Sequence, residues 1–151
     1  MMFLKKKFKV GGIEMKRLNK DDYYMNIARA VSLRSTCIRA HAGAIIVKDD
    51  QIVSTGYSGS ARGEKNCCDV DRCERDILNI KPGTRYELCK SVHAEANAII
   101  HAGCDKTNGG TMYLYFERLD GRKEKHGGPC IMCARMIKQA GIKEIKVEEI
   151  V

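Results

Sequence analysis

His93-Ala94-Glu95, together with Pro129-Cys130-Ile131-Met132-Cys133 further along the chain, decides both the fold and the chemistry of this sequence. His93, Cys130 and Cys133 offer the nitrogen and sulfur ligands that zinc prefers, and three protein ligands leave one tetrahedral position open. An open position is typical of a catalytic zinc, which lowers the pKa of a bound water toward neutrality. Glu95 follows shortly after a ligand and is placed to carry the protons of such a reaction.

The spacing of the ligands also predicts local structure. Cys130 and Cys133 stand at positions i and i+3, so they share one face of a helix. Pro129 suits the start of that helix, and helix N-termini favour thiolates. His93 is expected to begin a second helix. The inward faces are predicted to carry Ala134 and Ile137 in the cysteine helix, and Ala96, Ile99, Ile100 and Gly103 in the histidine helix.

Two other interpretations of the cysteine pair are a structural zinc site and a redox Cys-x-x-Cys. A structural zinc normally closes with a fourth protein ligand. Here the best-placed fourth residue is Glu95, which the signature H-x-E…P-C-x-x-C uses as general acid and base. The chain carries this signature in full and so resembles the zinc-dependent nucleobase deaminases. That resemblance implies the hydrolytic removal of an amine from a base.

Length and composition predict one globular domain. The 151 residues are 44% hydrophobic, and no apolar run is as long as a membrane helix. The net charge is 27 − 19 = +8, but the N-terminal end supplies much of the excess, so nucleic acid is not the expected partner. We interpret residues 1–18 as a basic N-terminal tail and 19–151 as the deaminase domain. The basic residues at this end are Lys5, Lys6, Lys7, Lys9, Lys16, Arg17 and Lys20.

The order of hydrophobic patterns and turn signals predicts an α/β fold. Asp49-Asp50 separates two apolar runs as in a hairpin. The order resembles the cytidine deaminase-like fold, a three-layer α/β/α architecture with a mixed sheet of four to five strands. The expected elements are a helix from Asp21 or Asp22 to about Ser35, strands over 43–48 and 51–57, a polar insert over 61–86, the His93 helix, a strand over 111–116, a charged loop over 117–128, the cysteine helix ending at Gly141, and a strand over 142–149.

Several segments outside the zinc motif carry a narrower likeness. They are Ser35-Thr36-Cys37, Gly43-Ala44-Ile45-Ile46-Val47, Ile52-Val53-Ser54-Thr55-Gly56-Tyr57, Lys65-Asn66-Cys67-Cys68-Asp69 and His93-Ala94-Glu95-Ala96-Asn97-Ala98-Ile99. They resemble the deoxycytidylate (dCMP) deaminases, among them phage and competence-associated bacterial enzymes, over roughly Asp21 to Val147. The resemblance implies zinc-dependent hydrolysis of dCMP to dUMP and ammonia. It also implies a homo-oligomer and, in some members, dCTP or dTTP as effectors.

The eight cysteines favour metal binding or reduced thiols over disulfides, because no secretion signal is recognisable, and the cytoplasm is the expected compartment. Several dCMP deaminases hold a second, structural zinc. Cys37 and Cys67 fall on its ligand positions, and Cys68, Cys73 and Cys89 are available to complete the set. The alternative is a group of free reduced thiols.

Two departures from the family concern substrate binding. The family usually has Gly-Tyr-Asn-Gly where this chain has Gly56-Tyr57-Ser58-Gly59, so recognition of the sugar is expected to differ. Relatives run almost directly from the third strand into Pro-Cys, whereas a charged loop over 117–128 intervenes here. Arginine pairs well with phosphate oxygens, so this loop is a candidate to bind a substrate phosphate; the alternative is a solvated loop. The candidate substrate contacts are Ser58, Gly59, Arg62, Lys65, Ala94, Arg118 and Arg122.

The zinc motif leaves other functions open. Within the superfamily these are deamination of a tRNA adenosine and deamination of a pterin or riboflavin precursor. A different class is a non-catalytic, regulatory module that binds zinc or a nucleotide. The retained Glu95 argues against that module, and Cys37 with Cys67-Cys68 favours the dCMP group.

Overall fold

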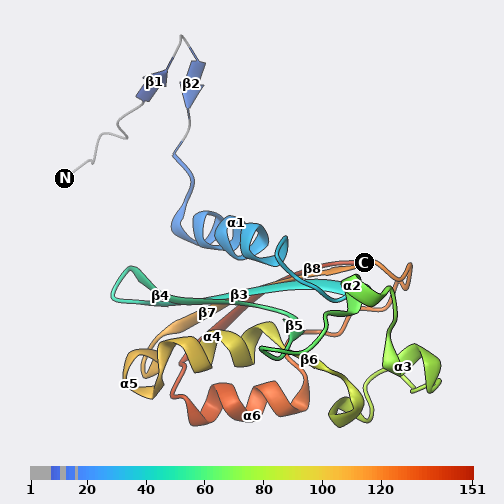
Figure 1. Ribbon diagram of the computed structural model, residues 1–151. Helices are drawn as coiled ribbons and strands as arrows, with labels where there is room; N and C mark the ends of the chain where they lie inside the picture. Colours follow the sequence, from blue (N-terminus) through green and yellow to red (C-terminus); the bar gives the residue numbers. More distant parts are fainter. Residues whose placement is uncertain (1–7, 11–12, 16) are drawn as a thin grey trace.

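A computed structural model describes residues 8–10, 13–15 and 17–151, and a four-stranded mixed sheet lies at its centre (Figure 1). The strands run in the order β4 (Gln51–Tyr57), β3 (Ala40–Lys48), β7 (Thr111–Arg118) and β8 (Glu144–Ile150). β3 is antiparallel to β4 and β7, and β8 is parallel to β7. Helix α1 covers one face, and α4 and α6 cover the other (Figure 1). The predicted three-layer α/β/α fold with a mixed sheet is therefore confirmed.

Helix α1 (Lys20–Ser32) packs on the sheet through Tyr24 and Ala28. Its N-cap is Asn19, whose side chain accepts a 2.8 Å hydrogen bond from the Asp22 amide, so the cap predicted at Asp21 or Asp22 is wrong. Asp21 instead accepts 2.7 Å hydrogen bonds from the Tyr113 hydroxyl and the Lys146 ammonium group, which tie the helix start to the sheet. Sequence periodicity cannot reveal such a partner, because Tyr113 and Lys146 lie far away along the chain.

Helices α4 (Ala94–Ala102) and α6 (Ile131–Gln139) form the opposite layer. Ala94, Ala98 and Ala102 of α4 join the core cluster together with Cys133 and Ile137 of α6, and the predicted inward residue Ala96 is buried as well. The inward faces predicted from the sequence are therefore partly wrong: Ile100 is 69% exposed, and Ala134 is exposed as well. Small alanines face the sheet because α4 lies so close to β4 that a larger side chain has no room.

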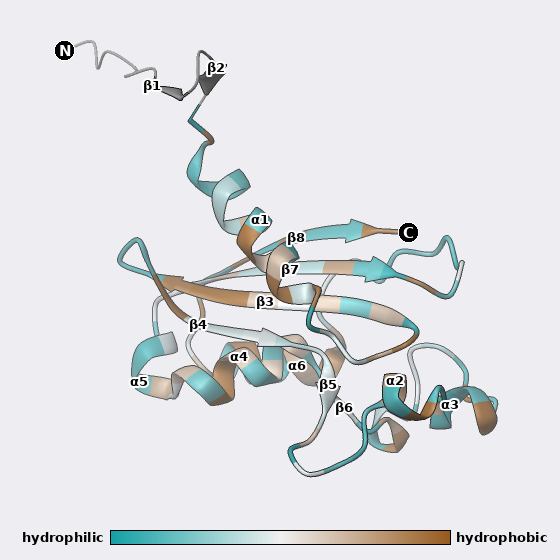
Figure 2. Ribbon diagram, turned by 45° about the horizontal axis from the view of Figure 1, so that its top comes forward, coloured by the Kyte–Doolittle hydropathy of each residue, from teal (hydrophilic) through white to brown (hydrophobic). Residues whose placement is uncertain are grey.

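The close approach of α4 to β4 centres on Gly56. A Cβ atom at Gly56 would lie 2.3 Å from the Ala98 nitrogen and 2.4 Å from the Ala94 oxygen, which is far inside van der Waals contact. Gly43 allows the same close approach on the other face of the sheet, where a Cβ atom would lie 2.2 Å from the Ala28 oxygen of α1. β3 carries the apolar run between these two layers, seen as the brown stretch of this strand in Figure 2.

The polar insert folds into short pieces beside the start of α4 (Figure 1). The strands on either side of the insert, β5 (Gly59–Ser60) and β6 (Ser91–Val92), pair as a two-stranded antiparallel sheet. Between these strands lie α2 (Cys67–Val70), α3 (Glu74–Ile77) and the 3-10 helix η1 (Tyr86–Leu88). The sequence predicted the insert but not these elements, because each is only a turn or so long. A further short helix, α5 (Cys104–Thr107), follows α4.

At the N-terminus, β1 (Phe8–Val10) and β2 (Ile13–Met15) pair as a separate antiparallel two-stranded sheet. The interpretation of residues 1–18 as a basic tail stays a prediction, and Lys5, Lys6, Lys7 and Lys16 lie outside the described residues. Among the helices of the described part, none is long and apolar enough to cross a membrane.

Replacing Gly56 with alanine is expected to displace α4 and with it the predicted ligand His93. Overpacking of this kind costs about 2 kcal/mol of unfolding free energy or more. Gly43→Ala is the matched control, because it strains α1 on the opposite face. We expect denaturant melts to show both variants destabilised and chelator competition to show weaker zinc binding only in Gly56→Ala. Wild-type zinc affinity in Gly56→Ala would contradict this role of the contact.

Candidate metal centre and active site

The starts of two helices meet at the predicted metal centre. His93 is the N-cap of α4, and Cys130 is the N-cap of α6. The Cys130 thiol accepts a 3.4 Å hydrogen bond from the Cys133 amide, so it takes the capping place that serine or aspartate fills in other helices. The sequence put Cys130 inside the helix, but it lies one position before it because its side chain is needed as the cap.

Three ligand atoms converge at this point. His93 Nδ1 lies 3.5 Å from Cys130 Sγ and 3.4 Å from Cys133 Sγ, and all three atoms lie within 4.8 Å of one another. Tetrahedral zinc bonds put a nitrogen and a sulfur ligand about 3.6 Å apart, so the three residues fit this ion. Within the described part of the chain, this is the one group of three or more such ligands that close together.

The electrostatics of the cysteine pair suit a cation. Hydrogen bonds from Cys133 and His93 lower the pKa of the Cys130 thiol to about 3, although burial opposes the shift. The contact with Cys130 and burial raise the pKa of the Cys133 thiol, and the Cys130 contact also raises the pKa of His93. Cys130 is thus the thiol of the pair that loses its proton more readily, and a metal ion that binds here displaces protons from its neighbours.

Glu95 lies in the first turn of α4 and is only 5% exposed. Burial raises the pKa of its carboxyl group, and the nearby His93 only partly offsets this effect. A carboxyl group with a raised pKa can accept a proton and hold it near neutral pH, which is what a general acid and base must do.

These residues open onto a cavity of about 1150 Å³, which includes open solvent at its mouth. His93, Ala94, Glu95 and Cys130 line it. Ser58, also in the lining, is 8% exposed, and its hydroxyl shares a 2.9 Å hydrogen bond with the Ser35 hydroxyl. Three other candidate contacts, Gly59, Arg62 and Lys65, are not part of the lining.

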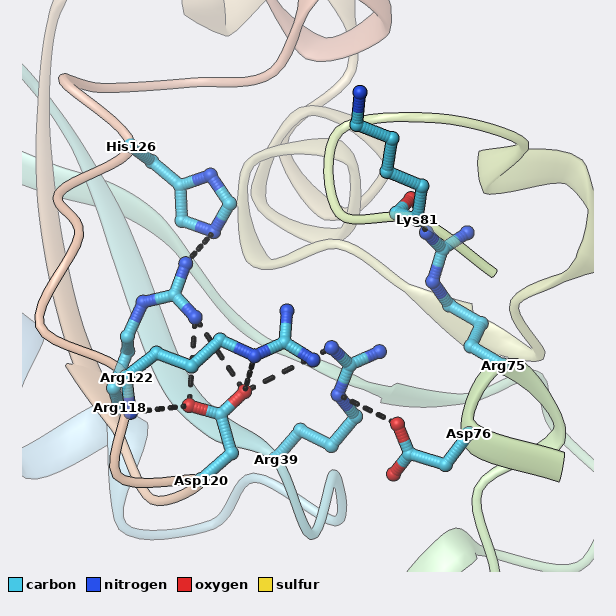
Figure 3. A network of polar contacts seen from close by, with 8 residues as sticks. All are labelled: Arg39, Arg75, Asp76, Lys81, Arg118, Asp120, Arg122 and His126. Atoms are coloured by element: carbon cyan, nitrogen blue, oxygen red, sulfur yellow. Dashed lines mark hydrogen bonds and ion pairs between the residues drawn. The ribbon is translucent and has the colours of Figure 1, made fainter. Parts of the chain in front are cut away.

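The charged loop brings Arg118 and Arg122 to the same cavity, and both converge on Asp120 (Figure 3). Arg118 Nη1 lies 3.4 Å from both carboxylate oxygens, and Arg122 Nε lies 3.3 Å from Oδ2. Arg39, from the segment before β3, adds its Nη2 at 3.7 Å from Oδ2. Burial would raise the pKa of Asp120, but the Arg122 amide and the charges of Arg118 and Arg122 hold it below its usual value.

The loop folds back on the sheet rather than standing free in solvent. Arg118 Nη2 lies 3.0 Å from His126 Nε2, and the His126 and Gly127 amides donate to the Glu149 carboxylate of β8. Burial and the charge of Arg118 lower the pKa of His126, so a neutral imidazole accepts the arginine hydrogen bond. The loop is therefore anchored through Arg118, His126 and Gly127, while most of its residues stay exposed to solvent, and phosphate binding by this loop stays a prediction.

The second cysteine group lies at the insert side of the cavity. Cys37, Cys67, Cys73 and Cys89 all line it, whereas Cys68 is exposed and its thiol contacts Asp69. Burial raises the pKa of Cys37 and of Cys67, and the neighbouring cysteines add to both shifts. The structure therefore gathers four of the five predicted candidates around one region, although not as tightly as the His93 centre.

No sequence motif pointed to Arg39, Arg75 or Tyr86, which also line the cavity. The Tyr86 ring meets the His93 ring edge to face, with centroids 5.5 Å apart. The Arg75 guanidinium lies over Tyr86, 5.2 Å from the ring centroid, and Arg75 is only 5% exposed. The folded insert brings Arg75 and Tyr86 to the metal centre, whereas Arg39 comes from the segment before β3.

Zinc retention is expected to depend on His93 and not on the other histidine of α4. His101 Nδ1 donates to the Thr55 carbonyl at 2.9 Å, away from the three ligand atoms. After dialysis, His93→Ala should lose about one zinc ion per chain because a tetrahedral site lacks a ligand. His101→Ala should retain its zinc, and metal analysis of both proteins checks this. Equal zinc contents would contradict the assignment.

Comparison with known proteins agrees with this geometry. Residues 18–149 match the family described as the cytidine and deoxycytidylate deaminase zinc-binding region. The chain is 32% identical over 136 residues to the deoxycytidylate deaminase of Mycobacterium phage D29, covering 87% of this chain and 95% of that protein. It is 32% identical over 125 residues to the deoxycytidylate deaminase of Schizosaccharomyces pombe, covering 83% of this chain but only 35% of that protein.

A solved structure gives the same result for the fold. The dCMP deaminase of cyanophage S-TIM5, in complex with dCMP and dUMP, has a TM-score of 0.61 and 25% sequence identity. The likeness covers 89% of this chain and 86% of that one. With the matched region spanning nearly all of the described domain and containing His93, Glu95, Cys130 and Cys133, the chain belongs to the cytidine and deoxycytidylate deaminase family.

Proposed function

We propose that this protein hydrolyses dCMP to dUMP and ammonia, with one zinc ion at His93, Cys130 and Cys133. The observation that carries the proposal is the buried Glu95 beside three converging ligand atoms, in one cavity with an arginine cluster. The phage and cyanophage relatives, which carry the name dCMP deaminase, support the choice of substrate. The ligand set supports the metal, because two sulfurs and one nitrogen suit zinc.

Zinc held by His93, Cys130 and Cys133 would supply the acidity that lets a water react near neutral pH. In the proposed mechanism, Glu95 accepts a proton from the attacking water and passes it to the ring nitrogen of cytosine while the oxygen bonds to C4. Glu95 then takes the proton that remains on this oxygen and delivers it to the amine, so that the C4–N bond breaks, ammonia leaves and the oxygen becomes the C4 carbonyl. Burial of Glu95 assists both transfers, because a raised pKa makes the carboxylate a better base and its acid stable enough to persist.

Recognition of the nucleotide is assigned to the two sides of the cavity. Arg118 and Arg122 bind the 5′-phosphate, since guanidinium groups pair with phosphate oxygens in a fixed geometry. Ser58 lies where the family usually has asparagine, and its bond to Ser35 fixes the hydroxyl toward the sugar side. Ala94 is fully buried and forms part of the wall for the base.

A substrate panel tests the reaction and separates it from its alternatives. Purified protein is offered dCMP, CMP, dCTP, deoxycytidine, a tRNA and a riboflavin precursor, and ammonia release is measured. We expect the highest kcat/KM with dCMP. Turnover of the tRNA or the precursor alone would assign another branch of the superfamily. No turnover of any compound by zinc-loaded protein would support the regulatory module.

Glu95→Gln is expected to retain zinc but to lose activity at least about a hundredfold, because general acid–base catalysis contributes roughly 10² to 10⁴ in rate. Glu87→Gln is the matched control, since Glu87 is an exposed carboxylate in the insert. Steady-state kinetics with dCMP and metal analysis on the same samples give the result. Near-normal turnover by Glu95→Gln would remove Glu95 from the reaction.

We also propose a second, structural zinc held by Cys37, Cys67, Cys73 and Cys89. The four thiols line one region, and Cys73 is buried, so a closed four-thiolate site would pin an insert that has little apolar core. Cys68 is left out because its side chain is exposed. The alternative remains a set of reduced thiols.

Cys73→Ser tests this site against Cys104→Ser, which alters an exposed thiol elsewhere. Fully loaded wild-type protein and Cys104→Ser should each contain about two zinc ions per chain, and Cys73→Ser about one, with a lower melting temperature because structural zinc contributes to folding. One zinc per chain in fully loaded wild-type protein would leave the cysteines as free thiols.

We also propose a homo-oligomer in the cytoplasm. Ile100 on α4 and Ile131 on α6 are 69% and 66% exposed, which supports a homo-oligomer because contacts between copies favour exposed apolar side chains. All eight cysteines lie in the described part of the chain and none forms a disulfide, which supports the reducing cytoplasm. We retain dCTP and dTTP as effectors on the strength of the family resemblance.

A further inference from the structure

We propose that Asp120 is a built-in anion that occupies the arginine cluster of the cavity and competes there with the phosphate of the substrate. The arginine cluster consists of Arg39, Arg118 and Arg122. Asp120 then sets how tightly phosphate-bearing ligands bind and how strongly the enzyme prefers a nucleotide to a nucleoside. The inference rests on the proposed function, in which phosphate binds at this place.

The positions of the groups support this exchange. Figure 3 shows the three guanidinium groups arranged around the single carboxylate of Asp120, with Arg75 across the same space. All of these side chains, Asp120 included, line the cavity that contains His93 and Glu95. The Asp120 side chain is also only 17% exposed. Asp120 is therefore not a surface counter-ion outside the active site.

The cluster has more donors than Asp120 can satisfy. The Arg118 side chain is 6% exposed, and its Nε is buried without a hydrogen-bond partner in the described structure. Arg122 Nη1 is also buried without one. Buried donors are nearly always paired in folded proteins, so two unpaired donors in one cavity indicate a ligand with several acceptor oxygens. A phosphate group has that chemistry.

Charge leads to the same conclusion. Three guanidinium groups face two carboxylates, Asp120 and Asp76, and Asp76 reaches only Arg39, at 3.4 Å, with 54% of its side chain exposed. The cluster therefore keeps an excess of positive charge. A phosphate monoester carries nearly two negative charges near neutral pH, more than the one charge of Asp120.

The contacts of Asp120 are long for a charge-assisted pair. Its distances to the guanidinium nitrogens are 3.3–3.7 Å, whereas strong pairs lie at about 2.7–2.9 Å. Its Oδ1 also accepts the Arg122 amide at 3.2 Å within its own turn, where Gly121 takes a φ of 74°. Asp120 is thus held by the loop itself and fills the cluster only loosely, as an exchangeable anion would.

Asp120→Asn tests the competition, because asparagine keeps an oxygen to accept the Arg122 amide but removes the charge and replaces the Oδ2 acceptor, which faces Arg39 and Arg122, with an amide NH2 group. We expect inorganic phosphate to bind zinc-loaded protein about tenfold more tightly by calorimetry. The ratio of kcat/KM for dCMP to that for deoxycytidine should rise by a similar factor. Asp76→Asn is the matched control: it removes the other carboxylate near Arg39, and a much smaller change is expected.

The outcomes separate this inference from the proposed function. Unchanged or weaker phosphate binding in Asp120→Asn, with an unchanged melting temperature, would overturn the role of Asp120 even if dCMP is the substrate. Arg118→Gln controls for a general effect of altering the loop. It should weaken phosphate binding both in the otherwise wild-type protein and in the Asp120→Asn variant. Tighter phosphate binding in Asp120→Asn without turnover of dCMP would support the anion site and reject the substrate.

Discussion

The close contact between α4 and β4 is the constraint on which the rest of the structure depends. Gly56 leaves room for the backbone of α4, and the alanines of that helix let it lie almost directly on the sheet. This contact fixes the start of α4, and His93 and Glu95 are at that start. α6 lies beside α4, and Cys130 is at the start of α6. The metal ligands therefore meet where the two helices begin.

The active site combines two electrostatic regions that differ in kind. Around Glu95 and the two cysteines, burial and short-range hydrogen bonds shift the pKa values of a few groups for proton transfer and metal binding. At the other side of the cavity, arginines gather charge around a single carboxylate. The first region is the one to which we assign the chemistry of the family. The second is built largely by the loop over 117–128, which intervenes just before the metal-binding cysteines.

The insert connects these regions. Its cysteines lie near the arginine side, and Tyr86 reaches the ring of His93, with Arg75 lying over it. Arg75 also donates hydrogen bonds to the Arg85 and Lys81 carbonyls, at 2.7 and 3.2 Å, so one buried side chain organises much of the insert. A segment with little apolar core of its own is thus held by polar contacts.

The sequence by itself determined that His93, Cys130 and Cys133 come together beside Glu95, the order of the main helices and strands, and a mixed sheet, for which it predicted four to five strands. These follow from short-range spacing and periodicity, which act within a few residues and survive without knowledge of the fold. Tertiary structure alone decided that Asn19 rather than Asp21 caps α1, that Ile100 points outward, and that Arg39 and Arg75 join the loop arginines. The reason is physical: each of these outcomes depends on partners far away along the chain, such as Tyr113 for Asp21 and Asp120 for Arg39.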